Sequence, residues 1–188
     1  MYIGFYNESM NSIMRSYRGL YRCNNLIDIC ESSSLCVKKD IEWYFRASIE
    51  GNYLEYTDNN MKRLLLLYQK LKGQKWEGDL VLFTDRVKAL APMNFKFLGY
   101  DICADSRYYS PIGDGFLTEY NEDMLFFSEM NIGQYRTYRN SLNDNYLFTS
   151  YDVALQFSQY CNYINEKYEH SVESENNWRP FAIYSRTE

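Results

Sequence analysis

The sequence predicts an α+β fold, with one domain over residues 1–188 and a small mixed sheet packed with several helices. Three observations lead to this prediction. A leucine-rich stripe at helical spacing lies between Asp58 and Gly73. Apolar runs typical of strands occupy 79–84, 94–102 and 178–184. A chain of 188 residues is also long enough to bury one core without disulfides or metals.

The elements before residue 58 are less regular. Tyr2–Tyr6 is a short apolar run that we interpret as a strand, and Asn7 can cap a helix that extends to about Arg22. Between Leu35 and Thr57, alternating apolar residues from Trp43 favour a hairpin that turns at 50–52. A helix from Lys38 to Ile49 is the alternative.

The middle of the chain gives the clearest signals. Asp58-Asn59-Asn60 caps the leucine-rich helix, and Gly73 ends it. The strand at 79–84 is followed by a predicted short helix, Asp85 to Ala91, and by the strand at 94–102. This order suggests a parallel βαβ step, although the helix is short for a parallel crossover.

The remaining elements complete the predicted domain. We expect a loop at 106–115, a helix from Glu119 to Ser128, and a polar loop at 131–145 that contains at most a short helix. Ser150 caps a helix that reaches about Asn165, and the strand at 178–184 completes the sheet.

Composition and charge narrow the classes of function. The chain has 20 Tyr and 11 Phe, and aromatic side chains are enriched both in cores and in interfaces. Residues 1–100 carry 14 basic and 11 acidic side chains, whereas residues 101–188 carry 6 and 14. The acidic second half of the chain argues against nucleic acid as the binding partner and is compatible with a basic protein partner. A charged surface that only maintains solubility is the simpler alternative.

The five cysteines include no C-x-x-C pair, and His170 is the single histidine. This pattern predicts no metal, no cofactor and reduced thiols in a cytoplasmic protein. The N-terminus lacks the features of a signal peptide, and no apolar run is long enough to span a membrane.

No motif of a hydrolase, a P-loop enzyme, a zinc protease or a dinucleotide-binding protein occurs, so we predict that the protein is not an enzyme. One alternative remains, a carboxylate-dependent enzyme that is possibly metal-assisted. It would require acids such as Asp101, Asp105, Asp114 or Glu122 to converge in a pocket.

The positive prediction is a partner-binding face in which acids attract a basic partner and aromatic side chains supply contact area. The residues of this predicted face lie in the stretch from Asn94 to Glu129. The predicted partner-binding residues are Asp101, Asp105, Tyr108, Tyr109, Asp114, Glu119, Tyr120, Glu122 and Asp123.

The run from Phe97 to Asp105, with Tyr108-Tyr109-Ser110, resembles a stretch found in bacterial immunity proteins of contact-dependent growth inhibition and other polymorphic toxin systems. The resemblance covers about a sixth of the chain. It implies a cytoplasmic inhibitor that binds a cognate basic protein toxin, with a nuclease as the expected class. A scaffold or regulatory domain that uses the same face for another partner is an alternative.

Overall fold

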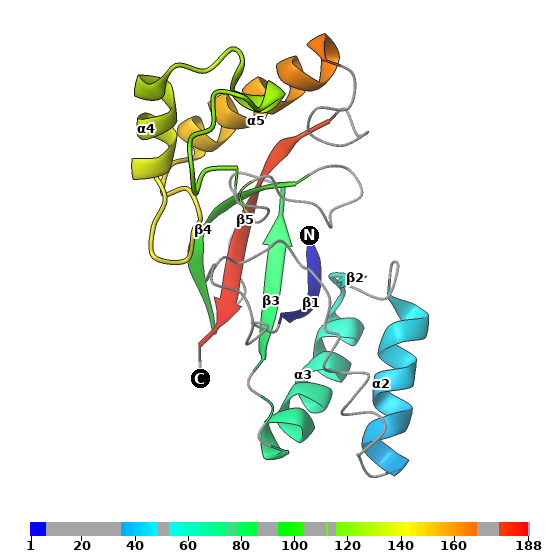
Figure 1. The fold of residues 1–188 in the computed structure, drawn as a ribbon. Coiled ribbons are helices and arrows are strands. Elements are labelled where there is room, and N and C mark those ends of the chain that lie inside the picture. Colours follow the sequence, from blue (N-terminus) through cyan, green and yellow to red (C-terminus); the bar gives the residue numbers. More distant parts are fainter. Residues whose placement is uncertain are drawn as a thin grey trace.

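A computed structural model shows an α+β arrangement, in which helices pack against a five-stranded sheet (Figure 1). The structure describes residues 1–6, 35–48, 53–74, 76, 78–85, 94–103, 112, 116–168 and 177–187. The predicted helix from Asn7 to Arg22, residues 86–91 of the predicted short helix and nearly all of the predicted loop at 106–115 lie outside these residues.

The sheet has the strand order β2-β1-β3-β5-β4. The strands are β1 (Tyr2–Tyr6), β2 (Tyr53–Glu55), β3 (Asp79–Thr84), β4 (Phe95–Cys103) and β5 (Arg179–Arg186). Every neighbouring pair is antiparallel, so the prediction of a mixed sheet was wrong in this detail. β3 and β4 both run antiparallel to β5, which lies between them, so they are parallel to each other but do not pair. The βαβ step remains a prediction, because most of its helix lies outside the described residues.

The helices are α2 (Leu35–Ala47), α3 (Asp58–Gly73), α4 (Ile132–Asn140) and α5 (Tyr151–Lys167), with a 3-10 helix, η1, at Leu125–Phe127. Within the described part of the chain, no helix is both long and apolar enough to cross a membrane.

The hairpin predicted after Trp43 was wrong, and the alternative of a helix was correct. In α2 the buried residues are Val37, Ile41 and Tyr44, which recur at helical spacing and pack against β1, β3 and α3. Trp43 and Phe45, two of the alternating apolar residues, are partly buried and pack against the edge of this cluster. The return strand does exist as β2, but it pairs with β1.

The helix α3 confirms the leucine-rich stripe. Its buried side chains are Met61, Leu64, Leu67 and Leu71. Its N-cap is Thr57, one residue before the predicted cap, and the Thr57 hydroxyl accepts a hydrogen bond from the Asn60 amide at 3.1 Å.

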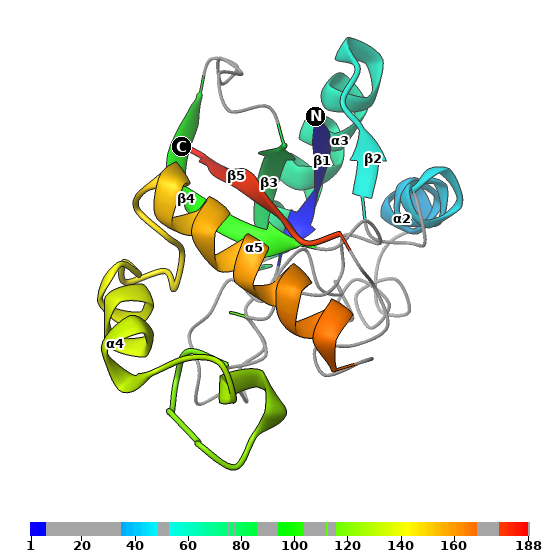
Figure 2. The same ribbon diagram turned by 90° about the horizontal axis from the view of Figure 1, so that it is seen from above.

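Two groups of helices cover different ends of the sheet. Helices α2 and α3 pack with Ile3, Phe5 and Leu80, whereas η1, α4 and α5 pack with Ile102 and Trp178. Figure 1 shows the two groups at opposite ends of the sheet, and Figure 2 shows the same arrangement from above. The molecule therefore has two helical ends joined by one sheet.

A loop after α4 covers part of the outer edge of β4. The backbones of Tyr100 and Phe148 exchange two hydrogen bonds of 2.9 Å, and the Asn143 amide donates to the carbonyl of Leu98 at 2.7 Å. Gly99 lies at a register shift with φ +152°, and a Cβ there would lie 2.6 Å from the Cβ of Leu147. Glycine is required by this close approach.

Candidate functional site

The predicted acidic and aromatic stretch divides between the interior and the surface. Phe126 and Phe127 are buried with α5, and Phe116 and Tyr120 pack against the same cluster. Glu119, Glu122 and Asp123 are exposed. Here the aromatic residues hold the segment in place, and the acidic side chains face solvent. We call residues 116–131 the acidic loop.

Three tyrosine hydroxyls hold the acidic loop, one within the loop and two from neighbouring helices. Tyr120 donates to the carbonyl of Met130 at 2.8 Å, and Tyr135 of α4 donates to the carbonyl of Leu117 at 3.2 Å. Tyr160 of α5 donates to the carbonyl of Phe126. A tyrosine hydroxyl is protonated at neutral pH and can donate, and burial raises the pKa values of Tyr135 and Tyr160 further above neutrality.

The predicted helix from Glu119 to Ser128 was wrong, since the loop contains turns and η1 instead. The Met124 amide donates to the carbonyl of Asn121 at 3.1 Å, which closes a turn. The Asn121 side chain accepts from the Asp123 amide at 3.0 Å. These local bonds compete with a helix, and they place Glu122 and Asp123 at the centre of the turn.

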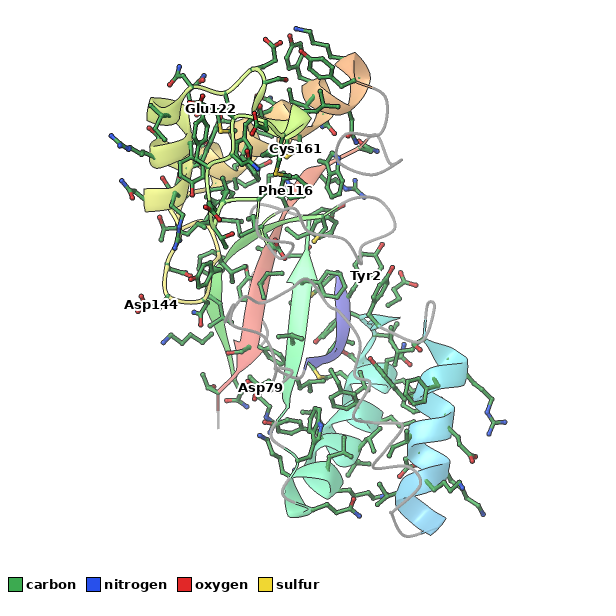
Figure 3. All side chains as sticks on the ribbon, in the orientation of Figure 1. Tyr2, Asp79, Phe116, Glu122, Asp144 and Cys161 are labelled. Carbon is green, nitrogen blue, oxygen red and sulfur yellow. The ribbon has the colours of Figure 1, made fainter. Side chains whose placement is uncertain are left out.

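The turn is followed directly by exposed apolar side chains. Met124 is 41 % exposed and Leu125 is 56 % exposed. Large apolar side chains beside acids suit a contact that is both apolar and electrostatic. We call Glu122, Asp123, Met124 and Leu125 the acidic tip. Figure 3 shows Glu122 at the end of the molecule formed by η1, α4 and α5.

Sequence reasoning missed the apolar half of the tip. The predicted partner-binding residues did not include Met124 or Leu125, and the predicted helix placed Met124 on one side together with Tyr120 and Phe127. The Asn121-Glu122-Asp123 run was the available signal, because Asn and Asp favour turns over helix interiors.

Glu129, at the end of the acidic loop, is held by α5. Its carboxylate accepts hydrogen bonds from Lys167 at 2.6 Å and from the Tyr168 hydroxyl at 2.7 Å. These two bonds, with Lys167 the larger effect, lower the pKa of Glu129. The Glu129 carboxylate therefore joins the loop to α5, whereas no ion pair among the described residues involves Glu122 or Asp123.

The other predicted site residues do not join the tip. Asp101 is only 1 % exposed, and one of its carboxylate oxygens accepts from the Ile102 amide at 2.8 Å, so its side chain faces the interior. A contact between Asp101 and a surface partner is not compatible with this burial. The predicted residues Asp105, Tyr108, Tyr109 and Asp114 lie outside the described residues. Of the predicted set, the structure places Glu119, Tyr120, Glu122 and Asp123 in one loop.

In the described part of the chain, no group of three or more His, Cys, Asp or Glu side chains that could hold a metal ion occurs. Cys103 and Cys161 are buried free thiols, and burial raises the pKa of Cys161. A thiol in such a setting is a poor nucleophile.

Comparison of the chain with protein-family models, with curated proteins and with solved structures gave no match.

Proposed function

We propose that this protein is an immunity-type inhibitor that binds and neutralises a cognate basic protein toxin through its acidic tip. A nuclease is the expected class of toxin, because a nuclease needs a basic surface to bind nucleic acid. The proposal includes a cytoplasmic location, where such a toxin would act.

The observation that supports the proposal is the acidic tip itself. Glu122 and Asp123 form the centre of a closed turn, and Met124 and Leu125 follow as exposed apolar contacts. Because hydroxyl hydrogen bonds hold the backbone of the rest of the loop, binding costs less backbone freedom than it would in a loop without them. Acids would accelerate encounter with a basic surface, and the apolar pair would lengthen the life of the complex.

The alternative of a carboxylate-dependent enzyme has less support. It needs acids such as Asp101, Asp105, Asp114 or Glu122 to converge in a pocket. Asp101 is buried and Glu122 lies at an exposed turn, while Asp105 and Asp114 lie outside the described residues. No observation among the described residues favours the enzyme, and we do not propose it.

The experiment that tests the proposal is capture of the neighbouring gene product. If a large toxin gene lies beside this gene, the purified toxin domain should bind the protein and lose its activity in a stoichiometric mixture. The variant E122K/D123K should weaken capture at least tenfold, mainly through slower association.

A matched control separates local from global charge. D144K/E166K makes the same change in net charge at two exposed acids outside the acidic tip, and it should leave capture within about twofold of the wild type. Unchanged capture by E122K/D123K would show that the tip is not the binding surface. Absence of any binding at low and high salt would refute the proposed function.

A further inference from the structure

The α2–α3 end of the molecule carries a surplus of positive charge. Its two helices contain seven basic side chains, Lys38, Lys39, Arg46, Lys62, Arg63, Lys70 and Lys72, and three acidic ones, Asp40, Glu42 and Asp58. Two of these acids already have a cationic neighbour, since Asp40 pairs with Lys70 at 2.5 Å and Glu42 pairs with Arg46 at 3.3 Å. Lys72 also pairs, with Asp79 at 4.0 Å. Among the described residues, Lys38, Lys39, Lys62 and Arg63 form no ion pair.

An exposed leucine lies inside this positive surface. Leu66 of α3 is 59 % exposed, and Lys62 and Arg63 precede it by four and three residues, which puts the three side chains on one side of the helix. The Arg63 guanidinium lies 3.7 Å from the ring centroid of Trp43 in α2, so its position is fixed by stacking. We call Lys62, Arg63 and Leu66 the basic face. No ion pair among the described residues involves Lys62 or Arg63.

The opposite end has the inverse charge. Residues 116–168 contain seven acidic side chains, Glu119, Glu122, Asp123, Glu129, Asp144, Asp152 and Glu166, and three basic ones, Arg136, Arg139 and Lys167. Figures 1 and 2 both place α2 and α3 away from the end that holds η1 and α4. One molecule thus carries two surfaces of opposite sign at separate ends, each with exposed apolar side chains.

We infer that copies of this protein associate head to tail, with the acidic tip of one copy on the basic face of the next. The two surfaces are complementary in charge, because Glu122 and Asp123 of one copy face Lys62 and Arg63 of the next. Leu125 and Leu66 supply the apolar contact. Helix α3, which carries the basic face, lies at the opposite end of the molecule from Glu122, so the two surfaces do not meet within one copy (Figures 1 and 3).

The geometry of this contact has a consequence for assembly. It is heterologous, because each copy contributes a different surface, and so every pair leaves one tip and one face open. Growth therefore continues with concentration until a ring closes or the protein is exhausted. Exposed ion pairs contribute little individually and are screened by salt, so the association is weak and depends on ionic strength.

Association and toxin binding use the same tip, and this part of the inference rests on the proposed function. A toxin bound at Glu122 and Asp123 excludes the next copy. The basic face, by contrast, is needed only for self-association.

The test is sedimentation velocity of the full chain as a function of concentration and salt. At low ionic strength the weight-average mass should rise with concentration above the 22.6 kDa of one chain, and it should return to that value near 1 M salt, where the screening length is about 3 Å. A mass of one chain under every condition would overturn the inference. So would association that does not weaken with salt.

Two charge-reversal variants identify the surfaces. E122K/D123K and K62E/R63E should each be monomeric alone, because each brings like charges together. An equal mixture should regain association, since the native tip of one variant meets the native face of the other. Either variant associating like the wild type, or the mixture staying monomeric, would overturn the inference.

All four substituted residues are exposed, and a far-UV circular dichroism spectrum unchanged from the wild type confirms folding of each variant. The same variants separate this inference from the proposed function. K62E/R63E should lose self-association and keep toxin capture, whereas failure of toxin capture by every form leaves the self-association result intact.

Discussion

The Tyr120 hydroxyl donates a hydrogen bond to the carbonyl oxygen of Met130, ten residues further along the chain and 2.8 Å away. This bond ties the beginning of the acidic loop to its end, while Tyr135 and Tyr160 attach the loop to α4 and α5. The high tyrosine content thus has a structural use, since a phenol can reach across the core and satisfy a loop carbonyl.

Tyr120→Phe should lower the free energy of unfolding by about 1 kcal/mol, because the ring is kept and the carbonyl of Met130 loses its donor. Urea denaturation followed by fluorescence measures this change. Tyr146→Phe is the matched control. No hydroxyl bond of Tyr146 occurs among the described residues, and its effect should stay within about 0.5 kcal/mol. Equal effects of the two substitutions would contradict the role of the Tyr120 bond.

Gly99→Ala should be strongly destabilising, by about 2–4 kcal/mol. Its φ of +152° disfavours a side chain, and the new Cβ would lie 2.6 Å from Leu147 and 3.0 Å from the carbonyl of Phe148. Thermal unfolding measures the loss. The control is Gly73→Ala, where nothing lies within 4 Å, and which should be neutral or slightly stabilising. A tolerated alanine at position 99 would mean that the loop can leave the edge of β4.

Helix α4 begins with a capping box between Asn131 and Gln134, in which each side chain accepts a bond of 3.0 Å from the amide of the other residue. Asn131→Ala should cost about 1 kcal/mol and should increase amide hydrogen exchange in the first turn of α4. Gln159→Ala, at an exposed position inside α5, is the control and should change neither quantity appreciably. Unaltered exchange in α4 after Asn131→Ala would refute the capping role.

Glu129 gives a prediction about pH. Its pKa is lowered by hydrogen bonds from Lys167 and Tyr168, so the ionised carboxylate is favoured in the folded state. The stabilisation is present above the pKa of Glu129 in the unfolded chain and is lost as the pH falls through the lower folded-state pKa. Carbon-detected NMR titration should place the Glu129 pKa below the ordinary glutamate range.

Lys167→Met should raise the Glu129 pKa towards the ordinary range, and it should remove the part of the acid-induced loss of stability that depends on this pair. Arg136→Met removes one exposed cation from the same half of the chain and serves as the control for net charge, since no ion pair of Arg136 occurs among the described residues. If both substitutions moved the Glu129 pKa equally, the effect would come from net charge and not from the Lys167 bond.

The elements that could be predicted from sequence are those whose buried apolar residues recur at the spacing of a helix or form a short continuous run typical of a strand. The stripe of α3 and the apolar runs of β3, β4 and β5 are of this kind, and the structure confirms all four. In α2, by contrast, Trp43 and Phe45 flank the fully buried Tyr44. This arrangement imitates a strand when only neighbouring residues are compared.

The candidate site depended on contacts that a local pattern does not contain. The acidic loop is non-helical because Asn121 bonds within its own turn and because Tyr135 and Tyr160 reach its carbonyls from distant positions. Asp101 is acidic and sits in a strand, but its burial is set by which strand and loop pack beside it. The sequence identified the acidic residues of the tip, and only the fold separated them from Asp101.

The central position of β5 bears on how the sheet can form during synthesis. Within the sheet, β4 pairs with β5 and with no other strand, although β5 follows it by more than seventy residues. On the ribosome, β1, β2 and β3 can therefore assemble early, while β4 waits for residues 179–186 to emerge. A nascent chain stalled before Arg179 would expose the unpaired edges of both β3 and β4, and such edges recruit other strands. The step most open to misassembly is thus the insertion of β5, which can occur only after the other four strands of the sheet have been synthesised.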